Sequence, residues 1–253
     1  MDIRVENLSF AYPGRKIFSA VNFELAAGKL HYLAGCNGAG KSTLLKLLCG
    51  YIKPQSGRIM LDEKDLLQIP HFQRAQMLGV LHQHISCELD FTVRETIFIT
   101  ASGRFPRLGR INAEDLQKFH AILERFELYK LENALFRELS GGEQQRVLAA
   151  GLFLLEPAIM LLDEPTSAFD PAWRNRMITM LKDYARTHTV LAITHDMELL
   201  AQADGELLLL DNSGKLHSGS ANEVLTGEIL TKVYGTPAGI TTDVNGRKHI
   251  TFA

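Results

Sequence analysis

Cysteine is scarce in this chain of 253 residues. Only three are present, Cys36, Cys49 and Cys87. An odd number of cysteines without the spacing of metal ligands is typical of reduced thiols in a reducing compartment. We therefore expect neither a disulfide bond nor a zinc site.

Long hydrophobic runs are also missing. The longest apolar stretch, residues 147–162, is interrupted by Glu156 and Pro157 and is shorter than a helix that spans a bilayer. Residues 1–5 contain no basic region followed by an apolar stretch, so we expect no secretion signal. Both absences predict that the protein stays in the cytosol.

Neither sign of charge is in excess. The chain has 27 Lys and Arg residues against 29 Asp and Glu residues, a formal net charge of −2. This balance does not favour a strongly basic protein, so nucleic acid is not among the expected partners. Hydrophobic residues make up 46% of the chain, which predicts a globular protein of one domain, or of one domain with an inserted lobe.

The N-terminal segment alternates apolar and polar residues. The alternation runs through residues 3–8 and again through residues 21–25, with Pro13 and Gly14 between them. Half-buried antiparallel strands show this pattern, so we expect a small antiparallel sheet at the start of the chain.

The rest of the core follows an α/β pattern. An apolar segment at residues 32–34 leads through a glycine-rich turn into an apolar helix at residues 42–49. Residues 158–162 and 190–193 are short apolar runs without alternation, as in parallel strands that are buried on both faces. These segments predict a doubly wound α/β sheet.

The middle of the chain is mostly helical in pattern, for example at residues 116–126. We expect a single domain over residues 1–253. In it, residues 1–84 and 151–253 form the catalytic core with its β subdomain, and residues 85–150 form an inserted helical subdomain. Near the C-terminus, Asn245-Gly246 predicts the turn of a β-hairpin.

The glycine-rich turn has the pattern of a phosphate loop, in which backbone N–H groups surround phosphate groups. We expect Lys41 to reach the β- and γ-phosphate oxygens and the Ser42 hydroxyl to bind Mg²⁺. ATP and Mg²⁺ are therefore the predicted cofactors, and a glycine-rich loop without a ligand is the alternative. The predicted nucleotide-binding residues of this segment are Gly35, Cys36, Asn37, Gly38, Ala39, Gly40, Lys41, Ser42 and Thr43.

Two adjacent carboxylates, Asp163 and Glu164, end a predicted buried strand. The carboxyl ends of parallel strands are where such sheets bind ligands. Asp163 is expected to hold Mg²⁺ directly or through the second coordination shell, and Glu164 to polarise the attacking water as a general base. An acidic loop without a ligand is the alternative.

A histidine follows the next apolar run. His195 would lie at the same edge of the sheet and could contact the γ-phosphate, which would make it catalytic together with Lys41 and Glu164. A structural hydrogen bond is the alternative, because it is the commoner role of a lone histidine at a strand end.

A second potential anion site occurs in the helical region. Ser140 has the position of an N-cap, and Gly141, Gly142 and Glu143 would form the first turn of the helix that follows. Taken alone, this segment is only a helix cap.

The phosphate loop, the Leu-Ser-Gly-Gly segment at residues 139–142, the strand that ends in Asp163 and Glu164, and His195 follow one another in an order typical of one family. Over nearly its whole length the sequence resembles the ABC (ATP-binding cassette) ATPases. The resemblance implies a RecA-like P-loop NTPase core with an antiparallel β subdomain and an inserted helical subdomain, and an activity in ATP hydrolysis for transport.

The resemblance also implies roles for individual residues. Tyr12 would stack on adenine, and Gln83 would contact Mg²⁺ and sense the membrane partner. Residues 167–170 would form the D-loop. Ser140 and Gly142 would bind the γ-phosphate held by a second copy of the chain, in a head-to-tail dimer. At two positions this sequence differs from the family pattern. Cys36 stands where many relatives have proline or serine, and Phe169 stands where most D-loops have leucine.

Within the family, residues 92–95 and 103–106 resemble the importers of iron-siderophores, haem and cobalamin, in which a C-terminal hairpin also occurs. The resemblance implies integral-membrane permease subunits, a substrate-binding protein, and a position at the cytoplasmic face of the inner membrane. A solvated basic loop is the alternative reading of Arg104, Arg107 and Arg110.

Two other functions stay open. An exporter ATPase would often be fused to membrane helices, but separate exporter subunits exist. A soluble ABC ATPase that acts on DNA or ribosomes is disfavoured, because the sequence lacks a tandem cassette, a coiled-coil insertion and a basic stripe.

Overall fold

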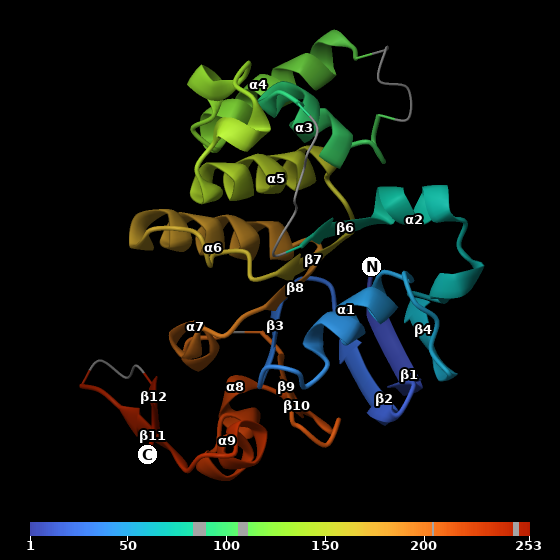
Figure 1. Ribbon diagram of the computed structural model, residues 1–253, viewed down its shortest axis with the longest axis vertical. Coiled ribbons are helices and arrows are strands. Elements are labelled where there is room, and N and C mark those ends of the chain that lie inside the picture. The colour runs from blue at the N-terminus through green and yellow to red at the C-terminus, as the bar shows by residue number, and fades with distance from the viewer. Residues whose placement is uncertain (83–89, 106–110, 204, 245–247) are drawn as a thin grey trace. The chain divides into compact units, whose positions relative to one another are not determined.

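The computed structural model describes residues 1–82, 90–105, 111–203, 205–244 and 248–253 (Figure 1). The chain divides into two compact units. The first unit consists of Met1–Ile69 with Met180–Ala253, and the second unit is Pro70–Thr179. The boundaries predicted from the sequence, at residues 84/85 and 150/151, separate the catalytic core from the helical subdomain of one domain. They stay a prediction.

The first unit contains the antiparallel sheet expected at the start of the chain. Ile3, Val5 and Leu8 of its long strand are buried, whereas the alternate residues are more exposed, which confirms the interpretation of the alternating pattern. The strands, in spatial order, are β2 (Arg15–Leu25), β1 (Ile3–Tyr12), β4 (Ser56–Leu61) and β5 (Lys64–Asp65).

The same unit contains four neighbouring strands of a mixed sheet. The order is β10 (Leu216–Gly219), β9 (Leu207–Leu210), β3 (Leu30–Gly35) and β8 (Thr189–Ile193). The central strand β3 is parallel to both β8 and β9. All residues of β3, β8 and β9 are buried, so these mostly apolar segments are strands covered on both faces.

Helices and a hairpin complete the first unit. Helix α1 (Lys41–Leu48) follows β3 through the glycine-rich turn, as predicted. The C-terminal hairpin is confirmed, but Asn245 and Gly246 lie outside the described residues. The remaining elements are η1 (Leu66–Gln68), α7 (Met197–Ala201), α8 (Ala221–Val224), α9 (Gly227–Tyr234), β11 (Ala238–Thr242) and β12 (Lys248–Phe252).

The second unit is mostly helical, with two parallel strands, β6 (Leu78–Leu81) and β7 (Ile159–Asp163). Its helices are α2 (His71–Met77), α3 (Val93–Thr100), α4 (Ala113–Arg125), η2 (Tyr129–Leu131), η3 (Phe136–Glu138), α5 (Gly141–Leu155) and the start of α6 (Pro171–Ala185). The predicted helix at residues 116–126 corresponds to α4, and α5 packs against α3 and α4 (Figure 1).

An apolar core holds these helices together. The rings of Phe98 and Phe119 stack at 4.8 Å between centroids, and both side chains are buried. Gly151 allows α5 to approach α3 closely, because a Cβ atom at this position would lie 2.4 Å from the Cβ of Thr100. In the described part of the chain, no helix is both long and apolar enough to cross a bilayer.

Candidate functional site

The phosphate loop lies between β3 and α1. Gly35 must lack a side chain, because a Cβ atom there would lie 2.2 Å from the carbonyl oxygen of Leu210 in β9. Gly40 is the N-cap of α1 and has a φ of 111°, in the region that favours glycine. No side-chain hydrogen bond caps α1, and the N-terminus of a helix favours the binding of an anion.

Lys41 is buried at the start of α1, with 8% of its surface exposed. Its Nζ atom donates hydrogen bonds to the carbonyl oxygens of Gly35 (2.7 Å) and Cys36 (2.9 Å). These bonds hold the ammonium group at the loop, where its charge favours phosphate.

Two contacts from distant parts of the first unit support the same loop. The guanidinium of Arg15 donates a hydrogen bond to the carbonyl of Gly38 at 2.5 Å, and the thiol of Cys36 donates one to the carbonyl of Val233 at 2.9 Å. The sequence predicted a role for Cys36 but none for Arg15 or Val233. No local pattern marks either residue, because both contacts arise from packing.

His195 follows β8, and the parallel register brings β8 beside β3. Leu33 pairs with Ile193, and the backbone N–H of Thr194 donates to the carbonyl of Leu33 at 3.1 Å. The segments that follow β3 and β8 therefore leave the sheet at the same edge, as the sequence predicted. His195 is exposed there.

Tyr12 ends β1 in the same unit. Its side chain is 40% exposed, and its ring meets that of Phe10 edge to face at 5.0 Å between centroids. An exposed aromatic ring with a fixed orientation is suited to stacking on a base. Gln83, which the resemblance assigns to Mg²⁺, lies outside the described residues.

In the second unit, β7 ends in Asp163, as predicted, and Glu164 follows it. Glu164 is buried and has a φ of 54°, a left-handed conformation that is uncommon for a residue with a side chain. Backbone conformations of this kind occur at active sites, where the surrounding structure holds them. Asp163 thus ends the strand, and Glu164 begins the following turn with a constrained backbone.

The predicted N-cap of the second anion site is also confirmed. The Ser140 hydroxyl accepts from the N–H of Glu143 at 3.4 Å, and the Glu143 carboxylate accepts from the N–H (2.9 Å) and hydroxyl (2.6 Å) of Ser140. These hydrogen bonds lower the pKa of Glu143, first through the Ser140 hydroxyl and then through its N–H. Any phosphate that binds Ser140 must therefore displace or share the bond to an ionised carboxylate.

The structure gives Arg104, the first arginine of the basic segment, specific partners. Arg104 forms ion pairs with Glu156 and with Asp115, the latter at 3.8 Å, and its side chain is only 23% exposed. Arg104 is therefore paired and mostly covered, unlike a residue of a solvated basic loop. Arg107 and Arg110 lie outside the described residues.

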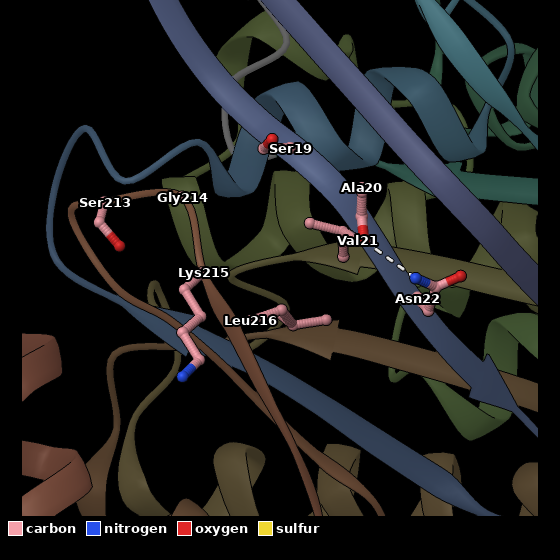
Figure 2. Close-up of a pocket in the computed structure, with 8 residues that line it drawn as sticks. All are labelled: Ser19, Ala20, Val21, Asn22, Ser213, Gly214, Lys215 and Leu216. Carbon is pink, nitrogen blue, oxygen red and sulfur yellow. Dashed lines mark hydrogen bonds between the residues drawn. The ribbon is translucent and has the colours of Figure 1, made fainter.

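A small pocket in the first unit takes no part in these sites (Figure 2). It encloses about 200 Å³. Small-molecule sites usually have ~300–1,000 Å³. The Asn22 side chain donates to the carbonyl of Ala20 at 2.9 Å, so the wall is held by its own hydrogen bonds. Its lining residues are Ser19, Ala20, Val21, Asn22, Ser213, Gly214, Lys215 and Leu216, and none is a predicted site residue.

Comparison with known proteins identifies the family. The family model of the ABC transporter matches residues 18–167. The hemin import ATP-binding protein HmuV of Pseudomonas aeruginosa is 39% identical over 240 residues, which cover 92% of each chain.

Two solved structures have the same fold. An inward-facing transporter described as of metal-chelate type has a TM-score of 0.83 at 28% identity, with 99% of this chain and 97% of that chain covered. A bacterial Atm1-family ABC exporter with ATP bound has a TM-score of 0.77 at 28% identity, with 88% of this chain but 39% of that chain covered. The predicted P-loop NTPase fold with an antiparallel β subdomain is thereby confirmed. The chain belongs to the ABC transporter family, and it is an ATP-binding subunit that hydrolyses ATP for transport.

Proposed function

We propose that the chain is the ATPase of an importer that takes up haem or a related metal chelate, such as an iron-siderophore or cobalamin. The observation that carries the proposal is the 39% identity to a hemin import ATP-binding protein over 92% of both chains. The likeness to a metal-chelate type transporter over nearly the full chain supports it. An exporter subunit is the second candidate, favoured by the likeness to an Atm1-family exporter.

The phosphate loop and Lys41 would bind the phosphates of ATP, and Tyr12 would stack on adenine. The absence of a side-chain cap on α1 and the buried ammonium of Lys41 support this role. Ser42, Asp163 and Gln83 would hold Mg²⁺, which neutralises charge on the phosphates when it is bound. Oxygen ligands suit this ion, which in proteins usually keeps several waters and phosphate oxygens as ligands.

Glu164 would act on the attacking water. The carboxylate accepts a proton from water as the water oxygen bonds to the γ-phosphorus, and the bond between this phosphorus and the β,γ-bridging oxygen breaks. His195 would contact the γ-phosphate. The constrained backbone of Glu164 supports a role in which its side chain must have one direction.

A second copy of the chain would complete each nucleotide site. Ser140, Gly141, Gly142 and Glu143 lie at the N-terminus of a long helix, whose dipole favours the γ-phosphate bound by the partner copy. The dimer would work at the cytoplasmic face of the membrane with permease subunits, and indirectly with a substrate-binding protein.

The test is uptake by vesicles that contain a candidate permease of the metal-chelate importer type, with the ATPase and Mg-ATP on the same side of the membrane. Haem, a ferric siderophore and cobalamin are offered separately with the matching binding protein. ATP-dependent uptake of one chelate, lost with Lys41→Ala, is the expected result. ATP-dependent movement in the opposite direction only would support the exporter and contradict import.

A further inference from the structure

Gln145 connects the start of helix α5 with the segment that follows β7. Both ends of its buried side-chain amide form hydrogen bonds with backbone atoms. The Nε2 atom donates to the carbonyl of Glu164 at 2.8 Å, and Oε1 accepts from the N–H of Ala168 at 3.2 Å. One side chain therefore holds both ends of the turn at residues 164–168.

The carbonyl of Glu164 belongs to the residue with the left-handed backbone. Besides Gln145, the hydroxyl and the N–H of Ser167 donate to it, at 3.1 and 3.3 Å. Because a residue with a side chain disfavours this conformation, it persists only where the surroundings determine it. Gln145 supplies the only one of these three donors that comes from outside the turn.

The contact between the helix and the turn is close at a second point. A Cβ atom on Gly142 would lie 3.1 Å from the carbonyl oxygen of Ala168. Gly142 and Gln145 are three residues apart, so they lie on the same face of α5. Ser140 caps this helix. The start of α5, which includes the Leu-Ser-Gly-Gly segment, thus contacts the turn that contains Glu164 at Gly142 and at Gln145.

We propose that Gln145 is a positioning residue for ATP hydrolysis, which sets the direction of the Glu164 side chain according to the position of the Leu-Ser-Gly-Gly segment. This inference rests on the proposed role of Glu164 as general base. Gln145 acts through the backbone of Glu164 and does not itself contact the nucleotide. Through it, binding of a phosphate at Ser140 affects the base in the same chain.

Loss of the amide should loosen the turn without unfolding the protein. The side chain of Gln145 is buried, so leucine, of similar size, fills most of the same space. Ala168 is exposed, so water can accept from its N–H in the variant. The effect is therefore expected in the rate of hydrolysis rather than in folding.

Two variants separate the two hydrogen bonds. Gln145→Leu removes both. Gln145→Glu keeps an acceptor for Ala168 but places a carboxylate oxygen against the carbonyl of Glu164. Gln144→Glu is the matched control, because Gln144 is the preceding residue of α5 and its amide donates to a different carbonyl, that of Phe136, at 3.1 Å.

We expect kcat to fall by roughly 10- to 100-fold in both Gln145 variants, since a misplacement of about 1 Å can cost ~10²-fold. KM and the Kd for Mg-ATP should change less than about threefold, and Gln144→Glu should stay near the parent rate. Circular dichroism and thermal unfolding establish that each variant is folded. Parent-like kcat in both Gln145 variants, or an equal loss in Gln144→Glu, overturns the inference.

The double variants Gln145→Leu/Glu164→Gln and Gln145→Glu/Glu164→Gln show whether Gln145 acts through the base. Their residual single-turnover rates should lie within about twofold of Glu164→Gln alone, because residues that act as one unit are not additive. Additive losses in both would overturn the inference. If Glu164→Gln alone hydrolyses ATP at the parent rate, the general-base assignment fails instead, and the inference fails with it.

Discussion

The thiol of Cys36 in the phosphate loop donates a hydrogen bond to the carbonyl of Val233, 197 residues further along the chain, at 2.9 Å. Val233 and Tyr234 end α9, and the ring of Tyr234 meets that of Phe252 in β12 edge to face at 5.3 Å. Burial raises the pKa of Tyr234 above its ordinary value, so this hydroxyl stays neutral. Helix α9 is thus in contact with the proposed phosphate loop, and the C-terminal hairpin is in contact with α9.

Removal of this hydrogen bond should weaken the first unit. Cys36→Ala is expected to lower the free energy of unfolding by roughly 1 kcal/mol, the usual net contribution of one hydrogen bond. Urea denaturation measures the change. Cys36→Ser keeps a hydrogen-bond donor and should lose less unfolding free energy. A serine variant that is less stable than the alanine variant would show that the hydrogen bond to Val233 does not stabilise the protein.

Glu164→Gln should separate binding from hydrolysis. The amide keeps the shape of the side chain but cannot accept the proton, so kcat should fall by ~10²- to 10⁴-fold while Mg-ATP still binds. Size-exclusion chromatography with Mg-ATP should then show a stable dimer. Lys41→Ala is the control and should remain monomeric, because it lacks the ammonium held at the phosphate loop. A Glu164→Gln chain that binds Mg-ATP only as a monomer would argue against the proposed dimer.

Mixed dimers test whether Ser140 acts on the partner's nucleotide. Ser140→Arg removes the cap of α5 and blocks its N-terminus, and Lys41→Ala removes phosphate binding. In a head-to-tail dimer of the two variants, one site keeps both Lys41 and Ser140. Cross-linking with Mg-ATP should therefore detect mixed pairs and few pairs of either variant alone. If mixed pairs are as rare as the others, the head-to-tail arrangement is wrong.

Arg104 should contribute to stability. Arg104→Glu places a third carboxylate beside Asp115 and Glu156, so the free energy of unfolding should fall by roughly 1–3 kcal/mol, as for other disrupted charge networks. Arg137→Glu is the control, because the ion pair of Arg137 with Asp90 is more exposed and should contribute less than about 1 kcal/mol. If chemical denaturation shows equal losses of unfolding free energy in Arg104→Glu and Arg137→Glu, the lower exposure of Arg104 does not strengthen its ion pairs. A loss of transport in Arg104→Glu would not by itself indicate coupling to a permease.

His31 should make the stability depend on pH. It is fully buried in β3, one ring nitrogen lies 2.8 Å from the carbonyl oxygen of Ala26, and burial lowers its pKa from 6.5. The unfolded chain therefore binds a proton more readily than the folded chain. The contribution of neutral His31 to the free energy of unfolding is therefore fully present above pH 6.5. It is lost as the pH falls below that value and through the pKa of the folded state.

His31→Gln isolates this contribution. Glutamine can still donate to Ala26 but does not titrate, so the difference in unfolding free energy between parent and variant should shrink as the pH falls from 7 to 5. Urea denaturation at several pH values measures it. A difference that is independent of pH would show that His31 has an ordinary pKa in the folded protein.

Local patterns in the sequence predicted several of the elements and the chemical groups of the proposed site. The alternation of apolar and polar residues indicates which residues of β1 are buried, a mostly apolar segment marks the fully buried β3, and glycines determine where the loop before α1 can bend. The Ser140 cap and the carboxylates after β7 are set by neighbours within a few residues. Such features depend on short-range sterics and hydrogen bonds, which the sequence displays directly.

Only the tertiary structure decided which side chains support that site. The bonds of Gln145 to Glu164, of Cys36 to Val233 and of Arg104 to its carboxylates join residues that are 19, 197 and up to 52 positions apart. Each depends on how helices and strands pack, and a shift of one residue in register would direct these side chains elsewhere. A polar side chain in the sequence shows what it can bind, but packing determines what lies within its reach.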